Sequence, residues 1–451
     1  MISPQRQRLH NYIIIWIGQV ASLIGSQISH FALLIWIWQH TGEATAISLL
    51  AFFREVPVLV ASIFAGILVD RANRKYLMML GDAIAGCSTI LIITLLLTNH
   101  LAIWHLFLIG AINGLFSDIQ GLAFSASTAL MVQKQDYVRV GAMGSIKDFG
   151  SGVFAPALAG VLYPLIGLSG ILIFDLITFM IAIASLIIVP VPQPTLEEKE
   201  SAESTTATIS LHKSWQELTF GFCYLLQHPS LLILQIFTVS YIFFDNAALL
   251  EPVILARTNS DTKVLGYVSS ALTLGGLIGA TGLGVWGGPK RRIRGLLWGR
   301  AIIFSLEMLL GLLCTPWMWM VAIFAAGLFK PTANSCEDAI WMSKVPPSFQ
   351  GRVFAASSFI TGIISPLGLL IAGPLSDFVF EPAMQSPNFF TPVLSNIFGS
   401  RPGSGMALQF ALFSFIVVLI CLVSYAIPLL RNIEDILPDH DVENVKLLHG
   451  D

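Results

Sequence analysis

The stretch Gly66-Ile-Leu-Val-Asp70-Arg71-Ala-Asn-Arg74-Lys75 places its charged side chains between two long apolar segments. Roughly 20 apolar residues lie on each side, which is the length that an α-helix needs to cross a bilayer. Charged residues with such flanks are typical of a connection between two membrane spans. We therefore interpret residues 66–75 as a cytoplasmic loop between the second and third spans of a membrane protein.

The composition supports this class of protein. Hydrophobic residues make up 55% of the 451 residues and charged residues only 11%, whereas about 25% of a soluble chain is charged. Length alone would suggest about three soluble domains, but the composition excludes that class. The formal net charge of -3 is close to balance and by itself says nothing about nucleic acid. For a membrane protein of this kind we expect no nucleic-acid partner.

Apolar runs of about 20 residues give twelve expected spans. The first six lie at about 11–38, 45–69, 76–97, 102–126, 140–167 and 169–189, and the second six at about 229–252, 264–287, 295–314, 317–341, 352–377 and 407–429. The predicted fold is therefore an all-α membrane protein with twelve transmembrane helices in two pseudo-symmetric six-helix bundles. Internal symmetry of this kind places a binding cavity near the midplane between the halves.

Polar segments set the expected boundaries: an N-terminal bundle at 1–189, a cytoplasmic linker at 190–228, a C-terminal bundle at 229–430 and a cytoplasmic tail at 431–451. Within the linker, residues 214–227 carry Trp215, Leu218 and Phe222 on one face, which predicts an interfacial helix. A proline-containing insertion at 378–405 exceeds a simple hairpin connection. We expect it to form a short cap on the outer side.

Positive charge marks the cytoplasmic side. Every even-numbered loop is basic, whereas the odd loops carry only Arg257, Lys263 and Arg401, so both termini are expected in the cytoplasm. The first span follows Arg6 and Arg8 without a small-residue cleavage site, so we expect a retained helix and no cleaved targeting segment. The scattered cysteines, without paired spacing, are expected to be small core residues: Cys87, Cys223, Cys314, Cys336 and Cys421.

Over nearly its whole length the chain resembles the major facilitator superfamily. Its loop motif between spans two and three is matched by Gly66, Asp70, Arg71, Arg74 and Lys75. A closer resemblance is to the bacterial drug-efflux branch that includes the macrolide-efflux proteins and the enterobactin exporter. This resemblance rests on Gly18-Gln19 through Gly25, Thr41-Gly42, Pro346-Pro347-Ser-Phe-Gln350-Gly351-Arg352, Pro366 and Gly373-Pro-Leu-Ser-Asp377.

The resemblance implies a conformational latch, in which Asp70 and Arg71 hold one conformation against the start of span eleven, near Arg352. Contacts between charges and helix ends form or break when two halves rock. The alternative is that these charges only enforce orientation, but Gly66 and Asp70 are unnecessary for that. The counterpart loop at 284–292 keeps the positive charge and lacks the aspartate, so any latch is expected to be asymmetric.

Span five carries small residues and a proline in mid-helix, at Gly152, Pro156 and Gly160. They are similar to the family's antiporter motif, although Ala155 stands where glycine is usual. Ordinary close packing of membrane helices is the alternative explanation. Span four lacks the arginine of many proton-coupled relatives and offers Asn113, Asp118 and Gln120 instead, so proton coupling is less well supported than transport itself.

Charge inside a span costs about 2.5 to 3.5 kcal/mol per residue on insertion scales, so such residues should face a cavity. The candidates are Arg54, Glu55, Asp118, Lys147, Asp148, Asp245, Glu307 and Lys330. Adjacent opposite charges point about 100° apart on a helix, so each is expected to pair with another helix. Asp82 and Asp175 lie nearer the predicted helix ends, where capping or snorkelling is expected.

A carboxylate that moves between a wet and a dry environment changes its affinity for a proton. Asp118, Asp148 and Asp245 are the predicted candidates for such a carrier. Gln27 and His30 in span one are candidates for the cavity wall, and the alternative for His30 is a hydrogen bond that serves helix packing. Lys330-Pro331-Thr-Ala-Asn334 combines a mid-membrane cation, a helix interruption and an amide, which suggests attraction of an anionic substrate group.

Together these features predict a multi-pass transporter of a bacterial inner membrane that exports a small amphipathic compound by alternating access, with proton antiport as the energy source. An importer or passive facilitator of the same fold is one alternative, and a non-transporting scaffold or sensor is another. Without a phosphate-cradling loop or a nucleophile constellation, we expect no enzyme, no cofactor and no metal. The expected partners are the substrate, protons and the lipid bilayer, and the expected state is a monomer.

Overall fold

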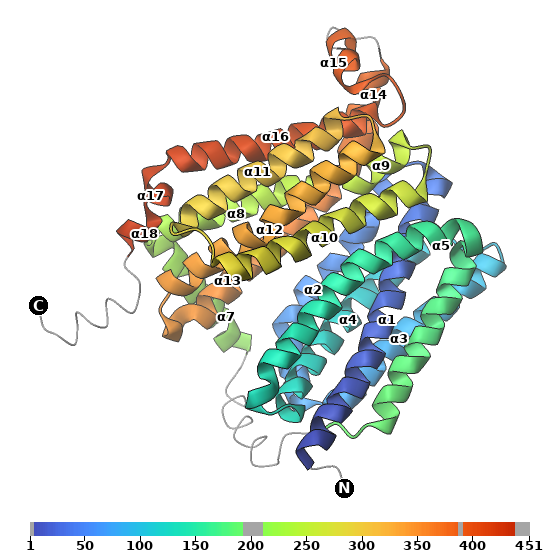
Figure 1. Ribbon diagram of the computed structural model, residues 1–451, viewed down its shortest axis with the longest axis vertical. Helices are drawn as coiled ribbons and strands as arrows, with labels where there is room; N and C mark the ends of the chain where they lie inside the picture. Colours follow the sequence, from blue (N-terminus) through green and yellow to red (C-terminus); the bar gives the residue numbers. More distant parts are fainter. Residues whose placement is uncertain (1–3, 193–210, 387–390, 438–451) are drawn as a thin grey trace, which may run out of the picture. The chain divides into compact units, whose positions relative to one another are not determined.

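The computed structural model describes residues 4–192, 211–386 and 391–437, and in these ranges the chain is helical with no strand. The N-terminal part contains α1 (Pro4–Thr41), α2 (Ala44–Arg71), α3 (Arg74–Leu97), α4 (Ile103–Met131), the 3-10 turn η1 (Lys134–Asp136) and α5 (Tyr137–Ile188) (Figure 1). The predicted all-α fold is thereby confirmed.

The C-terminal part continues with further helices (Figure 1). They are α7 (Leu211–Gln227), α8 (Pro229–Ala247), α9 (Leu250–Arg257), α10 (Thr262–Trp286), α11 (Arg292–Leu312), α12 (Pro316–Lys344), α13 (Pro347–Leu375), the π-helix η2 (Ser376–Phe380), α14 (Glu381–Gln385), α15 (Thr391–Phe398), α16 (Ser404–Ala426), α17 (Pro428–Arg431) and α18 (Ile433–Ile436).

The long helix α5 contains two of the predicted spans. Gly167 interrupts it with φ 64° and ψ -177°, a backbone conformation that only glycine adopts without strain. The chain reverses direction there (Figure 1), so the predicted break between 167 and 169 is correct.

Ten helices in the described ranges are long and apolar enough to cross a membrane. That number counts α5 once and does not include α12, which carries Lys330, Glu337, Asp338 and Lys344. The count of twelve spans stays a prediction.

The chain forms two compact units. The first comprises residues 1–206 together with 258–270, and the second comprises 207–257 together with 271–451. In the first unit, the hydroxyl of Thr262 donates to the carbonyl of Gly160 at 2.8 Å, and Ser270 donates to the carbonyl of Val153 at 2.7 Å. The first residues of α10 therefore contact α5 and are part of the first unit.

Helix pairing inside each unit follows one pattern. In the first unit α1 packs against α5, α2 against α4, and α3 against both α4 and α5. In the second, α8 packs against α13 and α16, and α11 packs against α12 and α16. Gly275 and Gly279 bring α10 against the backbone of α12. Equivalent spans thus make equivalent pairs, which is the internal repeat expected of such folds.

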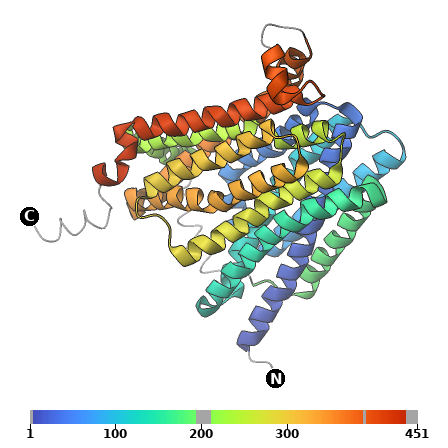
Figure 2. The ribbon, with the colours of Figure 1, turned by 45° about the horizontal axis from the view of Figure 1, so that its top comes forward.

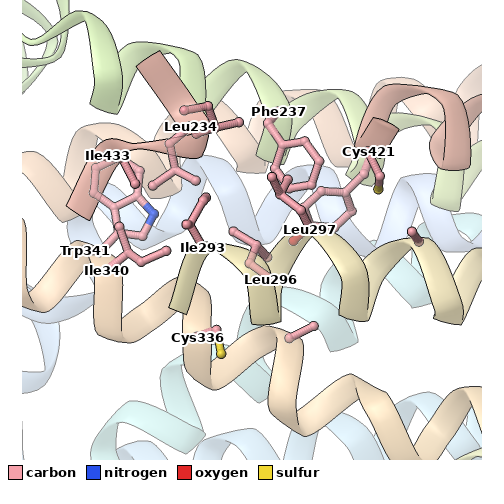
Figure 3. Packing of buried hydrophobic residues seen from close by; sticks show 14 of the residues in the cluster. Leu234, Phe237, Ile293, Leu296, Leu297, Cys336, Ile340, Trp341, Cys421 and Ile433 are labelled. Carbon is pink, nitrogen blue, oxygen red and sulfur yellow. The ribbon is translucent and has the colours of Figure 1, made fainter. Parts of the chain in front are cut away.

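A buried apolar cluster joins the helices of the second unit (Figure 3). Leu234 and Phe237 from α8 lie beside Leu296 and Leu297 from α11, and Ile433 from α18 is part of the same cluster. Two cysteines, Cys336 and Cys421, are buried in it. The expectation of core cysteines fails for the other three, because Cys87, Cys223 and Cys314 are exposed.

The predicted insertion is folded over its described residues as η2, α14 and α15, and α14 and α15 lie together at the start of α16 (Figures 1 and 2). The Glu381 carboxylate accepts hydrogen bonds from the backbone N–H groups of Gly403 at 2.8 Å and Gly405 at 2.9 Å. It thereby satisfies donors that the first turn of α16 leaves unpaired. Arg257 donates to the carbonyls of Phe398, at 2.9 Å, and Gly311, also at 2.9 Å, so α15 is held to the rest of the unit.

A helix is present where the interfacial helix was predicted, as α7, and it packs against α13. The Phe222 ring lies 6.4 Å from that of Phe359 on α13. The side chains of Trp215 and Leu218 lie outside the described residues. The position of α7 at a membrane interface stays a prediction.

Candidate functional site

The first unit encloses a cavity of about 240 Å³, with walls supplied by α1 to α5. Its apolar wall includes Leu33, Leu50, Phe116, Phe124 and Phe179. Its polar wall includes amides, hydroxyls and ionisable groups: Gln19, Ser22, Ser26, Gln27, Ser29, His30, Arg54, Asp82, Thr89, Asn113, Ser117, Gln120, Lys147 and Asp175. An apolar pocket with a few convergent polar groups is the usual form of a small-molecule site.

Helix α1 supplies a polar stripe to this wall. Gln19, Ser22, Ser26, Ser29 and His30 recur three or four residues apart, and this spacing places side chains on one face of a helix. Gln27 and His30, which were predicted for the wall of a cavity between the halves, line this cavity of the first unit. Span four contributes the predicted amides Asn113 and Gln120.

Asp82 is buried in α3, with 1% of its surface exposed. Its carboxylate accepts hydrogen bonds from Gln19 Nε2 at 3.0 Å, Ser22 Oγ at 3.3 Å and Gln120 Nε2 at 2.9 Å. Gly81 makes the last of these bonds sterically accessible, because a Cβ there would lie 2.5 Å from Gln120 Oε1. Amide and hydroxyl donors, rather than a cation, thus surround this carboxylate.

Asp175 lies in the second arm of α5, with 3% of its surface exposed. Thr89 Oγ1 donates to its Oδ2 at 3.3 Å, and its Oδ1 has no hydrogen-bond partner among the described residues. Gly25 allows α1 to approach, since a Cβ there would lie 2.1 Å from Thr178 Oγ1 and 2.9 Å from Asp175 Oδ1. The cavity wall therefore contains a second carboxylate, which accepts fewer hydrogen bonds from the described residues than Asp82 does.

The expectation that Asp82 and Asp175 cap or snorkel at helix ends is wrong. Helix α3 begins at Arg74 and the second arm of α5 begins after Gly167. Each aspartate is therefore about two turns inside its helix. Both carboxylates face protein and cavity rather than the surface.

Of the four charged residues predicted in spans two and five, two line the cavity and two do not. Arg54 and Lys147 line the cavity, whereas Glu55 and Asp148 are not part of its wall. Lys147 Nζ lies 3.7 Å from Asp148 Oδ1, so the expectation that these neighbours pair with other helices is wrong. The long lysine side chain spans the angle between adjacent positions. Lys147 also lies 5.8 Å from the ring centre of Phe124.

The predicted proton carriers do not line the cavity. Asp148 is exposed, with 72% of its side chain accessible, and Asp245 on α8 is also exposed. Asp118 is half-buried on α4, one residue from Ser117, which does line the cavity. A role for any of them in proton transfer stays a prediction.

In the second unit, a buried ion pair joins α11 to α12. Arg300 Nη2 lies 3.2 Å from Glu337 Oε2 and also donates to Asn334 Oδ1 at 2.7 Å and to Tyr241 Oη at 2.8 Å. Thr238 donates to the other oxygen of Glu337. Each carboxylate oxygen therefore has a partner, as burial of an ion pair requires.

A second ion pair lies between the same two helices. Lys330 Nζ is 3.3 Å from Glu307 Oε1, and Glu307 is 5% exposed. Glu307 balances the charge of Lys330 in this structure, and an anion-attracting role for Lys330 stays a prediction. Helix α12 also continues through Pro331, so the predicted interruption is wrong. Sequence reasoning did not single out Arg300 or Glu337, although charge inside a predicted span was the available signal.

Comparison with known proteins identifies the family. The family model of the Major Facilitator Superfamily matches residues 15–369. This chain belongs to that superfamily. Superfamily members of this kind are membrane transporters, so the chain is a transporter and not an enzyme. Among the described residues, no three His, Cys, Asp or Glu side chains are gathered as metal ligands.

Efflux proteins are among the relatives. Macrolide efflux protein A of Streptococcus pyogenes is 26% identical over 371 residues, covering 80% of this chain and 88% of that protein. The enterobactin exporter EntS of Shigella flexneri is 22% identical over 299 residues, covering 66% and 68% of the two chains. The predicted resemblance to this branch is thereby confirmed.

A similar fold is found in the crystal structure of a bacterial homologue of the iron transporter ferroportin in an inward-facing state. The TM-score is 0.62 at 14% identity, with 92% of this chain and 98% of that chain covered. At this identity the likeness concerns the fold alone.

The superfamily loop motif lies at the junction of α2 and α3. Gly66, Asp70 and Arg71 belong to the last turns of α2, and the side chains of Asp70 and Arg71 lie outside the described residues. Arg74 donates to the carbonyl of Ala126 near the end of α4 at 2.8 Å, and Lys75 donates to that of Val189 at the end of α5 at 3.1 Å. Cations at helix C-termini are favourably placed. The Arg352 guanidinium lies 5.2 Å from the ring centre of Phe220, and the latch itself stays a prediction.

The antiporter-like motif lies in the first arm of α5. A Cβ at Gly160 would lie 2.5 Å from the carbonyl oxygen of Thr262, and one at Gly266 would lie 2.5 Å from that of Pro156. Gly160 therefore permits close packing, which was the alternative explanation for the motif. Gly152 lies about two turns before Gly160 in the same helix. A role of the motif in antiport stays a prediction.

Proposed function

We propose that this transporter exports a small amphipathic compound from the bacterial cytoplasm by alternating access, in exchange for protons. The observation that carries the proposal is the cavity of the first unit, in which two buried carboxylates lie in a wall of aromatic, aliphatic and amide side chains. Amphipathic ligands fit such walls, because apolar area supplies affinity and a few polar groups supply orientation.

Proton coupling is supported by the carboxylates. Ionisable groups inside a membrane protein are costly and mark proton relays or ion pathways. Asp82 and Asp175 both lie in the cavity wall, and neither makes an ion pair with any described residue. A carboxylate without a fixed cation can gain and lose a proton without breaking a salt bridge.

Export is supported by the similarity to two exporting relatives, a macrolide efflux protein and an enterobactin exporter. The basic even-numbered loops support cytoplasmic termini in an inner membrane. The protein is proposed to act as a monomer, with rocking of its two halves held in one state by Asp70 and Arg71.

The test is transport in everted membrane vesicles with a panel of amphipathic cations and anions, with and without a protonophore. Accumulation in everted vesicles that the protonophore abolishes is the expected result. Movement down the compound's own gradient, unaffected by the protonophore, would instead indicate a passive facilitator. Accumulation only in right-side-out vesicles would indicate an importer. Absence of movement for every compound, with normal membrane expression, would favour a scaffold or sensor.

A further inference from the structure

The Asp175 carboxylate combines deep burial with an incomplete set of partners. It is 97% buried, its Oδ2 receives one long hydrogen bond of 3.3 Å from Thr89, and its Oδ1 receives none from the described residues. The Ser26 and Ser29 hydroxyls lie beside this carboxylate, and Ser29 Oγ is likewise buried without a hydrogen-bond partner among the described residues. Leaving such polar atoms unpaired in a protein interior is costly.

The charged and titratable groups of the cavity leave Asp175 without a counter-ion. They are His30 on α1, Arg54 on α2, Asp82 on α3 and Lys147 on the first arm of α5. None of them makes an ion pair with Asp175 in the described part of the chain. An ionised carboxylate in this position would therefore be a buried, uncompensated charge, which is strongly unfavourable.

Asp82 has the opposite environment in the same cavity. Three donors, from Gln19, Ser22 and Gln120, point at its two oxygens. Hydrogen bonds to the charged form favour that form. Two carboxyl groups whose surroundings favour different protonation states suggest a division of roles between them.

We propose that Asp175 is the residue that binds the coupling proton. Asp82 stays ionised and keeps its hydrogen bonds within the cavity wall. A proton from the water of the open cavity bonds to Asp175 Oδ1, and the resulting O–H donates to the neighbouring Ser29 hydroxyl. Release returns the proton to water on the other side of the membrane and restores the carboxylate. This inference rests on the proposed function, since it assigns a residue to its proton-coupled step.

Infrared spectroscopy of the full-length protein in lipid vesicles tests the protonation state without measuring transport. A carboxylic acid has a C=O stretching band that a carboxylate lacks. At neutral pH, a band present in the wild type should be lost in Asp175→Asn and retained in Asp82→Asn. Retention of the whole acid band in Asp175→Asn would overturn the proposal.

A second variant protects this test against misfolding. Thr89→Val removes the hydroxyl that lies 3.3 Å from Asp175 Oδ2 while keeping nearly the same shape, and Asp175 itself stays in place. The acid band should shift in frequency because the group loses a hydrogen bond. An unshifted band would mean that the acid lies elsewhere and would also overturn the proposal.

Transport distinguishes the failure of this assignment from the failure of the proposed function. In everted vesicles, Asp175→Asn should lose proton-driven accumulation while keeping exchange of labelled for unlabelled compound, and Asp175→Glu should restore the proton drive. If a wild type that is proton-driven keeps its drive in Asp175→Asn and loses it in Asp118→Asn, Asp148→Asn or Asp245→Asn, the assignment is wrong. A wild type driven by sodium, or by no gradient, would contradict both the antiport and the assignment.

Discussion

Buried carboxylates are accommodated differently in the two units. In the first unit Asp82 and Asp175 lie among amides and hydroxyls, whereas in the second Glu307 and Glu337 lie beside Lys330 and Arg300. An ion pair keeps both partners charged, because removing either charge leaves the other unpaired. A carboxylate among neutral donors can change its charge at a smaller cost. The comparison assigns fixed, ion-paired charge to the second unit, and to the first unit two carboxyl groups among neutral donors, of which Asp175 is the proposed site of the change in charge.

Loss of a cation from the second unit should have the largest effect. Arg300→Leu leaves Glu337 buried without its cation, and breaking a buried pair in this way costs about 3 to 5 kcal/mol. Thermal unfolding in detergent, followed by the exposure of buried cysteines, measures the loss. The double variant Arg300→Leu with Glu337→Leu should recover much of it, because no unpaired charge remains. If the single and double variants were equally destabilised, the loss of stability would not come from leaving Glu337 buried without its cation.

The second-largest loss of stability is expected on disturbing the close contact between α2 and α4 in the first unit. A Cβ at Gly114 would lie 2.4 Å from the backbone oxygen of Arg54, whereas one at Gly121 in the same helix meets nothing within 4 Å. Gly114→Ala must separate α2 from α4 and should cost about 1 to 3 kcal/mol. Gly121→Ala is the matched control and should leave the melting temperature unchanged. Similar melting temperatures for the two variants would contradict the close approach and, with it, the position of Arg54 in the cavity wall.

Neutralising Asp82 should cost less than breaking the ion pair of the second unit. Asp82→Asn places an amide opposite the amides of Gln19 and Gln120 and loses acceptors for them, at a cost of about 1 to 3 kcal/mol. The same thermal assay measures this change, with Ser22→Ala as the control that removes one donor and keeps the charge. If Asp82→Asn lost as much stability as Arg300→Leu, carboxylates among neutral donors would be no easier to neutralise than ion-paired ones, and the proposed difference between the two units would be wrong.

Apolar runs and loop charges predicted the helices, including the break at Gly167, because both signals are local in the chain. They also predicted Gln27, His30, Arg54 and Lys147 as polar residues of a cavity or span. They misplaced Asp82 and Asp175. The number of residues between an aspartate and a predicted helix end does not tell how deeply its side chain is buried among the neighbouring helices. The pairing of Lys330 with Glu307 depends on which faces of two helices meet, and one sequence without its packing does not contain that information.

The smallest expected effect concerns the loops that carry the charged motif in the two units. The loop of the first unit has its own aspartate, Asp70, whereas the counterpart loop in the second has none. There the tail beyond α16 supplies the acid. Glu434 accepts from the backbone N–H of Arg292 at 3.0 Å, at the start of α11, and Asp435 lies 3.6 Å from Arg291.

Glu434→Gln removes the charge from this helix start and should cost about 1 kcal/mol, as loss of an N-terminal cap does. Asp435→Asn is the matched control, since its exposed ion pair should contribute about 0 to 1 kcal/mol. Melting temperatures at low and high salt separate the two, because screening weakens the exposed pair more than the cap. If Asp435→Asn is the more damaging variant, the tail acts through surface charge. Glu434 would then not take the place in the second unit that Asp70 has in the first.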